Sequence, residues 1–247
     1  MIAFRAIFAA SLRQLFTKKR IIGFGLIALL PAVLVALVPS TDFPADTFLD
    51  ITTETLLKLI VPIIAIVLAS GVLGDERSDK TLSFLTLRPI SRFTIAGGKI
   101  AATASAASAF AAFGAISLGA AYALRGGVGG PTLALIVSGV LSATLYTAFV
   151  TPLGYLTRRA TILALSYLIL VDNVVIAAIP AMASSSPWRV GLAGGAGLLP
   201  PNFRTAAALD AIGTLEIGLA GAVVQVAGTV GVLTVILGLL LSRRDNV

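Results

Sequence analysis

The sequence contains no cysteine and no histidine, and only 12% of its 247 residues are charged. Without these residue types the chain has no Cys or His nucleophile, no Ser-His-Asp triad, no ordinary zinc site and no disulfide. A soluble domain typically has about 25% charged residues, and so few polar side chains cannot cover a globular surface. The composition argues against a cytosolic globular enzyme, and we expect no catalytic residues and no metal site.

Hydrophobic residues, in contrast, make up 57% of the sequence. A helix of about 20 residues crosses a hydrocarbon core of about 30 Å. The long apolar runs are continuous and do not alternate as the strands of a membrane barrel do. We therefore predict an all-α integral membrane protein whose residues 21–247 form one domain of six transmembrane helices. The predicted spans are 21–38, 54–73, 100–124, 132–156, 161–181 and 217–241.

The basic residues predict the orientation of these spans. If the N-terminus is cytoplasmic, the inner side holds fourteen of the eighteen Lys and Arg residues, as the positive-inside rule requires. We expect a multi-pass protein of the cell (inner or plasma) membrane with both termini cytoplasmic. Orientation and contact with anionic lipid headgroups account for the net charge of +7, so no nucleic-acid partner is needed.

Residues 1–20 precede the first span. Phe4, Phe8, Leu12 and Leu15 recur at helical spacing and form one stripe. This pattern predicts an amphipathic helix that lies in the inner membrane interface. The alternative is a simple helical extension of the first span.

The connection between the fifth and sixth spans, residues 182–216, is rich in Gly and Pro but remains partly apolar. Trp188 follows a helix-breaking Ser-Ser-Ser-Pro run, and tryptophan is common at the outer membrane interface. The segment either dips into the headgroups or covers the outer mouth of a cavity. The alternative is a disordered Gly-rich connection.

The most informative stretch joins the second and third spans. We expect Gly74 to end the second span and Ser78 or Asp79 to cap a short helix, which Pro89 ends. Such a partly apolar, charged helix is suited to docking into a groove of a soluble partner, although an ordinary basic inner loop is the alternative. The candidate docking residues are Asp75, Glu76, Arg77, Ser78, Thr81, Leu82, Phe84, Leu85, Arg88, Pro89 and Arg92.

This stretch carries a family resemblance. An acidic residue and an arginine (Glu76-Arg77) precede a Thr-Leu-x-x-Leu run at 81–85, then Arg-Pro-Ile-Ser-Arg at 88–92 and Gly-Gly-Lys at 97–99. The pattern resembles that of membrane (permease) subunits of type-two ATP-binding-cassette (ABC) transporters. The resemblance covers the whole chain in layout, but in residue detail only positions 74–99.

The resemblance implies ATP-driven export by a dimer of permeases, either a homodimer or a heterodimer. Each permease would dock a cytoplasmic ABC-type ATPase through a coupling helix between spans two and three. ATP and Mg would be bound by that partner, and this chain would bind no cofactor itself.

The residues agree that this chain is not the ATPase. A phosphate-binding loop follows a strand and reads G-x-x-x-x-G-K-[ST]. The nearest match ends in Gly98-Lys99, but Phe93 replaces the first glycine, Ile100 replaces Ser or Thr, and no strand precedes it.

Three polar residues inside the spans are candidates for the translocation pathway: Asp172 and Asn173 in the fifth span and Gln225 in the sixth. Asp172 lies thirteen residues after Arg159, about 20 Å along a helix, and has no evident basic partner in the sequence. A membrane carboxylate is costly, so a role in transport is one interpretation. The missing basic partner favours the alternative, a structural hydrogen bond to a neighbouring helix or to the second permease copy. The glycines around Gln225 predict close packing within the chain.

Two other functions are compatible with a membrane protein. A secondary transporter coupled through Asp172 would need no ATPase, but the chain shows no clear inverted repeat. A membrane enzyme would need a converging catalytic set, which this composition does not offer. The sequence does not identify the cargo, although the apolar spans mildly favour a hydrophobic one such as a drug or a lipid.

Overall fold

The structure is a computed structural model that describes residues 2–38, 45–78, 90–127, 130–203 and 218–243, together with Ile212 and Leu215. Its described residues form helices and connections without a strand, so the predicted all-α membrane fold is confirmed. Two segments, η1 and η2, are π-helices, and η3 and η4 are 3₁₀-helices. The elements are α1 (Ile2–Leu15), α2 (Lys18–Leu37), α3 (Ala45–Ile51), η1 (Thr52–Ile60), α4 (Val61–Ser78), α6 (Arg92–Leu124), α7 (Thr132–Leu156), α8 (Ala160–Ser166), η2 (Tyr167–Val175), α9 (Ile176–Ala178), η3 (Pro180–Ser185), α10 (Pro187–Ala196), η4 (Pro201–Phe203) and α12 (Leu219–Arg243).

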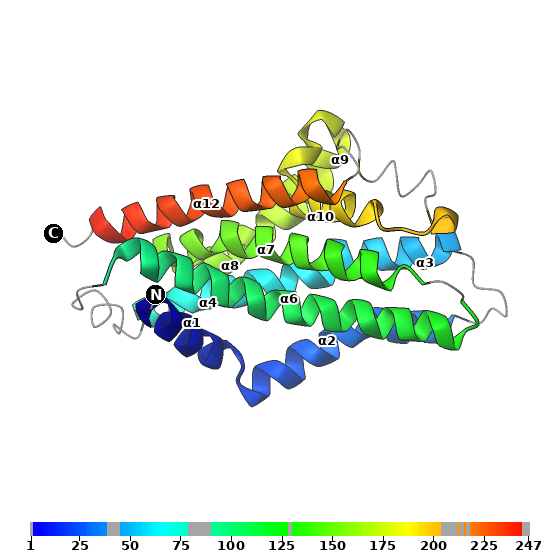
Figure 1. Cartoon of the computed structure of the whole chain (residues 1–247), viewed down its shortest axis with the longest axis horizontal. Helices are drawn as coiled ribbons and strands as arrows, with labels where there is room; N and C mark the ends of the chain where they lie inside the picture. The colour runs from blue at the N-terminus through cyan, green and yellow to red at the C-terminus, as the bar shows by residue number, and fades with distance from the viewer. Residues whose placement is uncertain are drawn as a thin grey trace.

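Within the described part of the chain, five helices are long and apolar enough to cross a membrane. They are Lys18–Leu37, Thr47–Gly74, Arg92–Leu124, Thr132–Leu156 and Leu219–Ser242. The prediction of six full-length spans therefore needs a correction at the fifth, because its apolar helix covers only Ala160–Val175. The chain turns at α9, well short of the end of the bundle that α6 and α7 reach (Figure 1).

Helix α7 lies at the centre of the bundle and packs against α4, α6, α10 and α12. Helices α1 and α2 cover one side of α6, and α12 runs along the other side of the bundle (Figure 1). The first and last described residues lie at the same end of the bundle. The spans differ greatly in burial: the apolar window of Thr47–Gly74 is 72% buried, whereas that of α12 is only 17% buried.

Helices α1 and α2 are separate, because Phe16 and Thr17 between them are not helical. The Thr17 hydroxyl accepts the Arg20 N–H at 3.4 Å and caps α2. The residues of α1 that are buried against its neighbours are Ile7, Ser11 and Leu15.

The predicted apolar stripe of α1 coincides only in part with the face that packs within the chain, and its position in the membrane interface stays a prediction. Phe4 and Phe8 stack on each other at 6.4 Å between ring centroids, and Phe4 is 39% exposed. The face that packs is set by α6, where Gly98 admits Ile7: a Cβ at Gly98 would lie 2.9 Å from Ile7 Cγ2. The Gly98-Lys99 pair is thus a helix-packing site, and it does not form a loop.

The Gly-rich segment after η3 forms the ordered helix α10, which is buried along its whole length. This excludes the disordered alternative for residues 187–196. It also corrects the predicted interfacial position of Trp188, whose side chain is only 1% exposed and lies inside the bundle.

Glycines bring α10 into backbone contact with α7. A Cβ at Gly191 would lie 2.4 Å from the Ser138 carbonyl oxygen, and one at Gly195 would lie 2.4 Å from the Ala134 carbonyl oxygen. Glycines four residues apart let two helices approach this closely in a membrane protein.

The glycines of α12 behave differently from the prediction. Only Gly238 is needed for packing, because a Cβ there would lie 2.4 Å from the Phe93 ring. At Gly218, Gly221, Gly228 and Gly231 an added Cβ would meet no described atom within 4 Å. Gly221, Gly228 and Gly231 thus face away from the described part of the chain, since α12 turns most of its surface outward. Gly218, just before α12, instead donates its N–H to the Ala193 carbonyl of α10 at 3.2 Å.

We expect Gly195→Ala to lower the free energy of unfolding by about 1–3 kcal/mol, because the added methyl group overpacks the α10–α7 contact. The matched control is Gly228→Ala, which adds the same methyl group to open space and improves helix propensity. Unfolding of the purified chain in detergent, followed by circular dichroism, measures both changes. Equal stability of the two variants would contradict the packing role.

Candidate functional site

Most of the predicted docking loop lies outside the described residues. This holds for Thr81, Leu82, Phe84, Leu85, Arg88 and Pro89. Positions Asp75, Glu76, Arg77 and Ser78 belong to the last turn of α4, and Arg92 begins α6. Helix α4 therefore continues past Gly74, where the sequence predicted its end, and the loop is joined at both ends to long helices.

A buried polar cluster surrounds Asp172, whose side chain is fully buried. The Tyr146 hydroxyl of α7 donates a hydrogen bond to Oδ2 of Asp172, and the Ser186 hydroxyl donates one to Oδ1. Both carboxylate oxygens are thus satisfied from two different elements. A buried carboxylate requires such donors, because an unpaired charge in a low-dielectric interior is very costly.

The π-helix η2 determines which side chains face this cluster. The side-chain amide of Asn173 donates a hydrogen bond to the backbone carbonyl of Leu168, five residues earlier, at 2.8 Å. π-Helical turns are rare and occur often at functional sites. In η2 the widened turn places Asp172 inside the bundle, while the neighbouring Asn173 is exposed.

Positive charges complete the cluster. The Arg189 guanidinium interacts electrostatically with Asp172 and lies over the Trp188 ring, with Cζ 4.7 Å from the ring centroid. On η1, the Lys58 ammonium lies 5.0 Å from the same centroid and pairs with Glu54. Both distances are within the range of cation–π attraction.

The four charged residues of the cluster, Asp172, Arg189, Glu54 and Lys58, balance in sign. The sequence suggested a carboxylate without a basic partner, and Arg189 corrects this. A balanced, hydrogen-bonded network is suited to holding elements together, because it has no unmatched charge to bind an ion. The described residues also contain no group of three or more His, Cys, Asp or Glu that could hold a metal ion.

The three predicted pathway residues do not converge on one cavity. The Gln225 amide on α12 donates to the Ser184 carbonyl at 2.7 Å, two residues from the Ser186 hydroxyl that binds Asp172. Gln225 and Asp172 therefore hold the same turn from opposite sides. Asn173 faces outward and belongs to neither contact.

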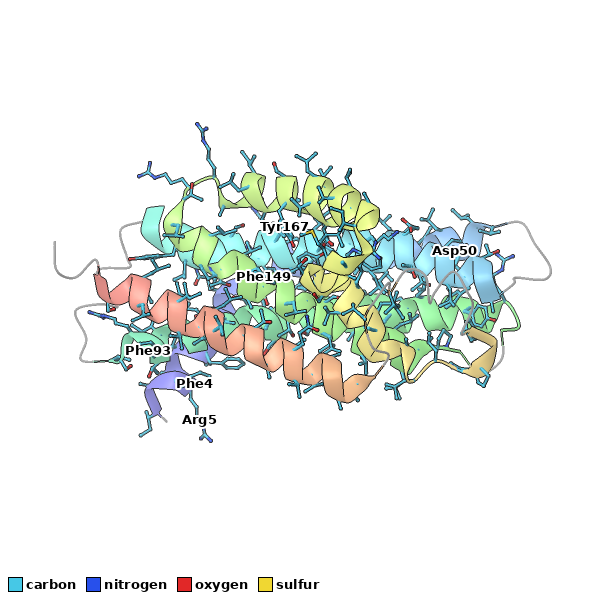
Figure 2. All side chains as sticks on the ribbon, turned by 90° about the horizontal axis from the view of Figure 1, so that it is seen from above. Phe4, Arg5, Asp50, Phe93, Phe149 and Tyr167 are labelled. Atoms are coloured by element: carbon cyan, nitrogen blue, oxygen red, sulfur yellow. The ribbon has the colours of Figure 1, made fainter. Side chains whose placement is uncertain are left out.

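Two hollows lie beside this cluster, on either side of Phe149. One, of about 240 Å³, is lined by α4, α7 and the α8–η2 helix and includes Tyr146 and Tyr167. The other, of about 420 Å³, lies between α7 and α12 and includes Gln225 and Thr229. Figure 2 shows Phe149 and Tyr167 side by side. Both hollows are mainly apolar.

Sequence reasoning missed Tyr146, Ser186 and Arg189 as partners of Asp172. They lie 14 to 26 residues away in the chain, and each has an ordinary alternative role. Of the contacts in the cluster, the pair of Glu54 and Lys58 has a local sequence signal, because their spacing of four residues favours a pair on one helix face.

We expect Asp172→Ala to lower the free energy of unfolding by about 3 kcal/mol, because it leaves Arg189 buried without its counter-charge. The double variant with Arg189→Met should lose less than the sum of the two single changes. Denaturation by sodium dodecyl sulfate in mixed micelles measures this cycle. The matched control is the exposed neighbour Asn173→Ala, which should change stability by less than about 0.5 kcal/mol. Full additivity of the two single changes would contradict the coupling.

A comparison with models of protein families finds one that matches well over half of the chain. The model of the family described as "ABC-2 family transporter protein" matches residues 16–179. The match runs from α2 to the end of the α8–η2–α9 helix, so it includes the loop after α4 and Asp172 but not α10 or α12. A search of curated proteins finds no match.

Proposed function

We propose that this chain, which belongs to the ABC-2 family of transporter proteins and is a membrane permease component of an ABC transporter, couples ATP hydrolysis by a separate cytoplasmic ATPase to export. The family match is the observation that carries this proposal. The ATPase would bind ATP and Mg, and the permease would dock it through residues 75–92. The positive-inside bias supports placing both termini and this loop on the cytoplasmic side of the cell membrane.

The fold offers a direct mechanical path from the loop into the membrane. Elements α3, η1 and α4 form an unbroken helical run over residues 45–78. Within this run, Lys58 lies about 30 Å from Ser78 along the helix. A movement of the loop would shift α4 as a rigid body and change the contact between Lys58 and Trp188. In this mechanism, the polar cluster responds to docking at a distance.

The same path leads past the two hollows beside Phe149. Ile66 of α4 lines the smaller one, and Gln225 of α12 lines the larger one. We place contact with an apolar cargo at the surface that these two hollows form. We assign to Asp172 the role of holding the neighbouring turn that carries Ser184 and Ser186. A second permease copy would complete the transporter, and the poorly buried α2 and α12 are the spans left to face lipid or that copy.

We expect the double variant Phe84→Glu/Leu85→Glu to abolish binding of the ATPase, because it places two charges in the apolar centre of the docking helix. Co-purification of the two subunits from detergent measures the complex. The matched control is Leu124→Glu, an equally apolar and 89% exposed position at the opposite end of α6. Undiminished association of the loop variant would refute docking at this helix.

Transport by the reconstituted permease and ATPase should depend on ATP and be blocked by vanadate. Collapse of the proton gradient with an uncoupler should leave it unchanged, because no ion-coupling step is involved. Uptake of a hydrophobic fluorescent dye into inside-out vesicles is a suitable assay, because export from the cytoplasmic side is then directed into the lumen. Uptake that continues without ATP and stops with the uncoupler would favour a secondary transporter instead.

A further inference from the structure

The smaller hollow beside Phe149 is rich in aromatic side chains. Three of its seven lining residues are aromatic, although aromatic residues make up only 7% of the sequence. Tyr146 and Phe149 belong to α7, and Tyr167 begins η2. The other lining residues are aliphatic: Ile66, Val150, Leu153 and Ala164. Two separate elements therefore bring three aromatic rings to one hollow of about 240 Å³.

The hollow offers no free hydrogen-bond donor from a side chain. The Tyr146 hydroxyl donates its proton to Asp172, and the Tyr167 hydroxyl donates to the Ser185 carbonyl at 3.0 Å. A phenol carries only one such proton, and the other described residues that line the hollow are Phe, Ile, Val, Leu and Ala. What remains are phenolic oxygens and ring faces, and the face of an aromatic ring is negative. The lining therefore does not suit an anion.

The polar cluster behind Tyr146 does not decide the sign of the ligand, because Asp172 interacts with Arg189 there. The preference has to come from the rings themselves. The hydrogen bond from Tyr146 to the carboxylate polarises the phenol and makes its ring more negative. This increases the attraction of the hollow for a positive charge.

We propose that this hollow binds the quaternary ammonium head of a hydrophobic organic cation, and that such cations are cargo of the transporter, a second step that rests on the proposed function. A cation within about 6 Å of an aromatic centroid is attracted to the ring face. A quaternary ammonium group has no N–H, so it leaves no unsatisfied donor in an apolar hollow. A primary ammonium group would bring three donors that need acceptors.

The size and the rim of the hollow agree with this ligand class. Sites for drug-sized ligands measure about 300–1,000 Å³, so a hollow of about 240 Å³ suits a compact head group better than a whole drug. The Phe149 side chain is 41% exposed. An apolar tail on the cation can therefore extend past Phe149 to the lipid-facing surface.

We expect the double variant Phe149→Leu/Tyr167→Leu to bind benzyltriethylammonium about 10-fold more weakly than the unchanged chain, because it removes two ring faces and keeps the hollow apolar. Equilibrium dialysis of the radiolabelled cation against the full chain in phosphatidylcholine nanodiscs measures binding, with empty nanodiscs subtracted. The ring-preserving variant Tyr167→Phe and the matched control Phe113→Leu, a 43% exposed position on α6 outside the hollow, should bind as the unchanged chain does.

A neutral isostere, in which carbon replaces the nitrogen, tests the charge without any variant. It should compete with the labelled cation at least about 10-fold less well than the unlabelled cation does. Equal competition would overturn the assignment to a cation, because it would show burial of apolar surface alone. Undiminished binding by the double leucine variant, or an equal loss in Phe113→Leu, would overturn the site.

Uptake into inside-out vesicles separates this inference from the proposed function. ATP-driven uptake of the labelled cation should fall about 10-fold in the double leucine variant and stay unchanged in Phe113→Leu. Binding of the cation without its uptake, in vesicles that still take up the dye with ATP, would overturn its role as cargo and leave the proposed function intact. The dialysis needs no ATPase, so failure of ATP-driven transport would leave the binding result standing.

Discussion

The arrangement of the helices around α10 depends on one buried carboxylate. Asp172 is hydrogen-bonded by Tyr146 on α7 and by Ser186 at the start of α10, and it lies close to Arg189. Through the stacked Trp188 ring, the network extends to Lys58 on η1. Four elements, η1, α7, η2 and α10, are therefore held together at one point. In a membrane interior, where apolar contacts between helices give little advantage over contacts with lipid, such polar contacts carry specificity.

Two π-helices, η1 and η2, flank this network: η1 contributes Glu54 and Lys58, and η2 contributes Asp172. π-Helical turns are rare and occur often at functional sites. The two π-helices and the polar contacts of the cluster thus occupy the same place in the bundle.

The sequence sufficed for features that depend on composition and local pattern. Hydropathy located the long spans, the absence of Cys and His excluded whole classes of chemistry, and residues 74–99 indicated the family that the comparison confirmed. Prediction from the sequence failed for features that depend on tertiary contacts. Ile7 on α1 is buried because Gly98 on α6 offers the space, and Trp188 is buried because α10 packs on α7.

The site shows the same limit. A lone Asp172 in an apolar run was visible, but its partners were not, because no spacing rule relates Tyr146 or Arg189 to it. The glycines of α10 and α12 look alike in the sequence. Only the fold shows that Gly195 lies against the backbone of α7 while Gly228 faces outward. Candidate docking residues such as Phe84 remain predictions.

The glycine contacts of α10 have a consequence for how the protein is assembled. Residues 160–196 run along the bundle, turn at α9 and pack back against it as α10, and neither helical part is long enough to cross a membrane alone. Gly191 and Gly195 bring α10 against the backbone of α7, and Val190 packs on Leu141 and Leu145, so α10 gains its stability from α7 and not from lipid. It is therefore expected to enter its position only after the longer spans have been inserted. The last step of biogenesis would then be the folding of this segment onto a membrane domain that already exists.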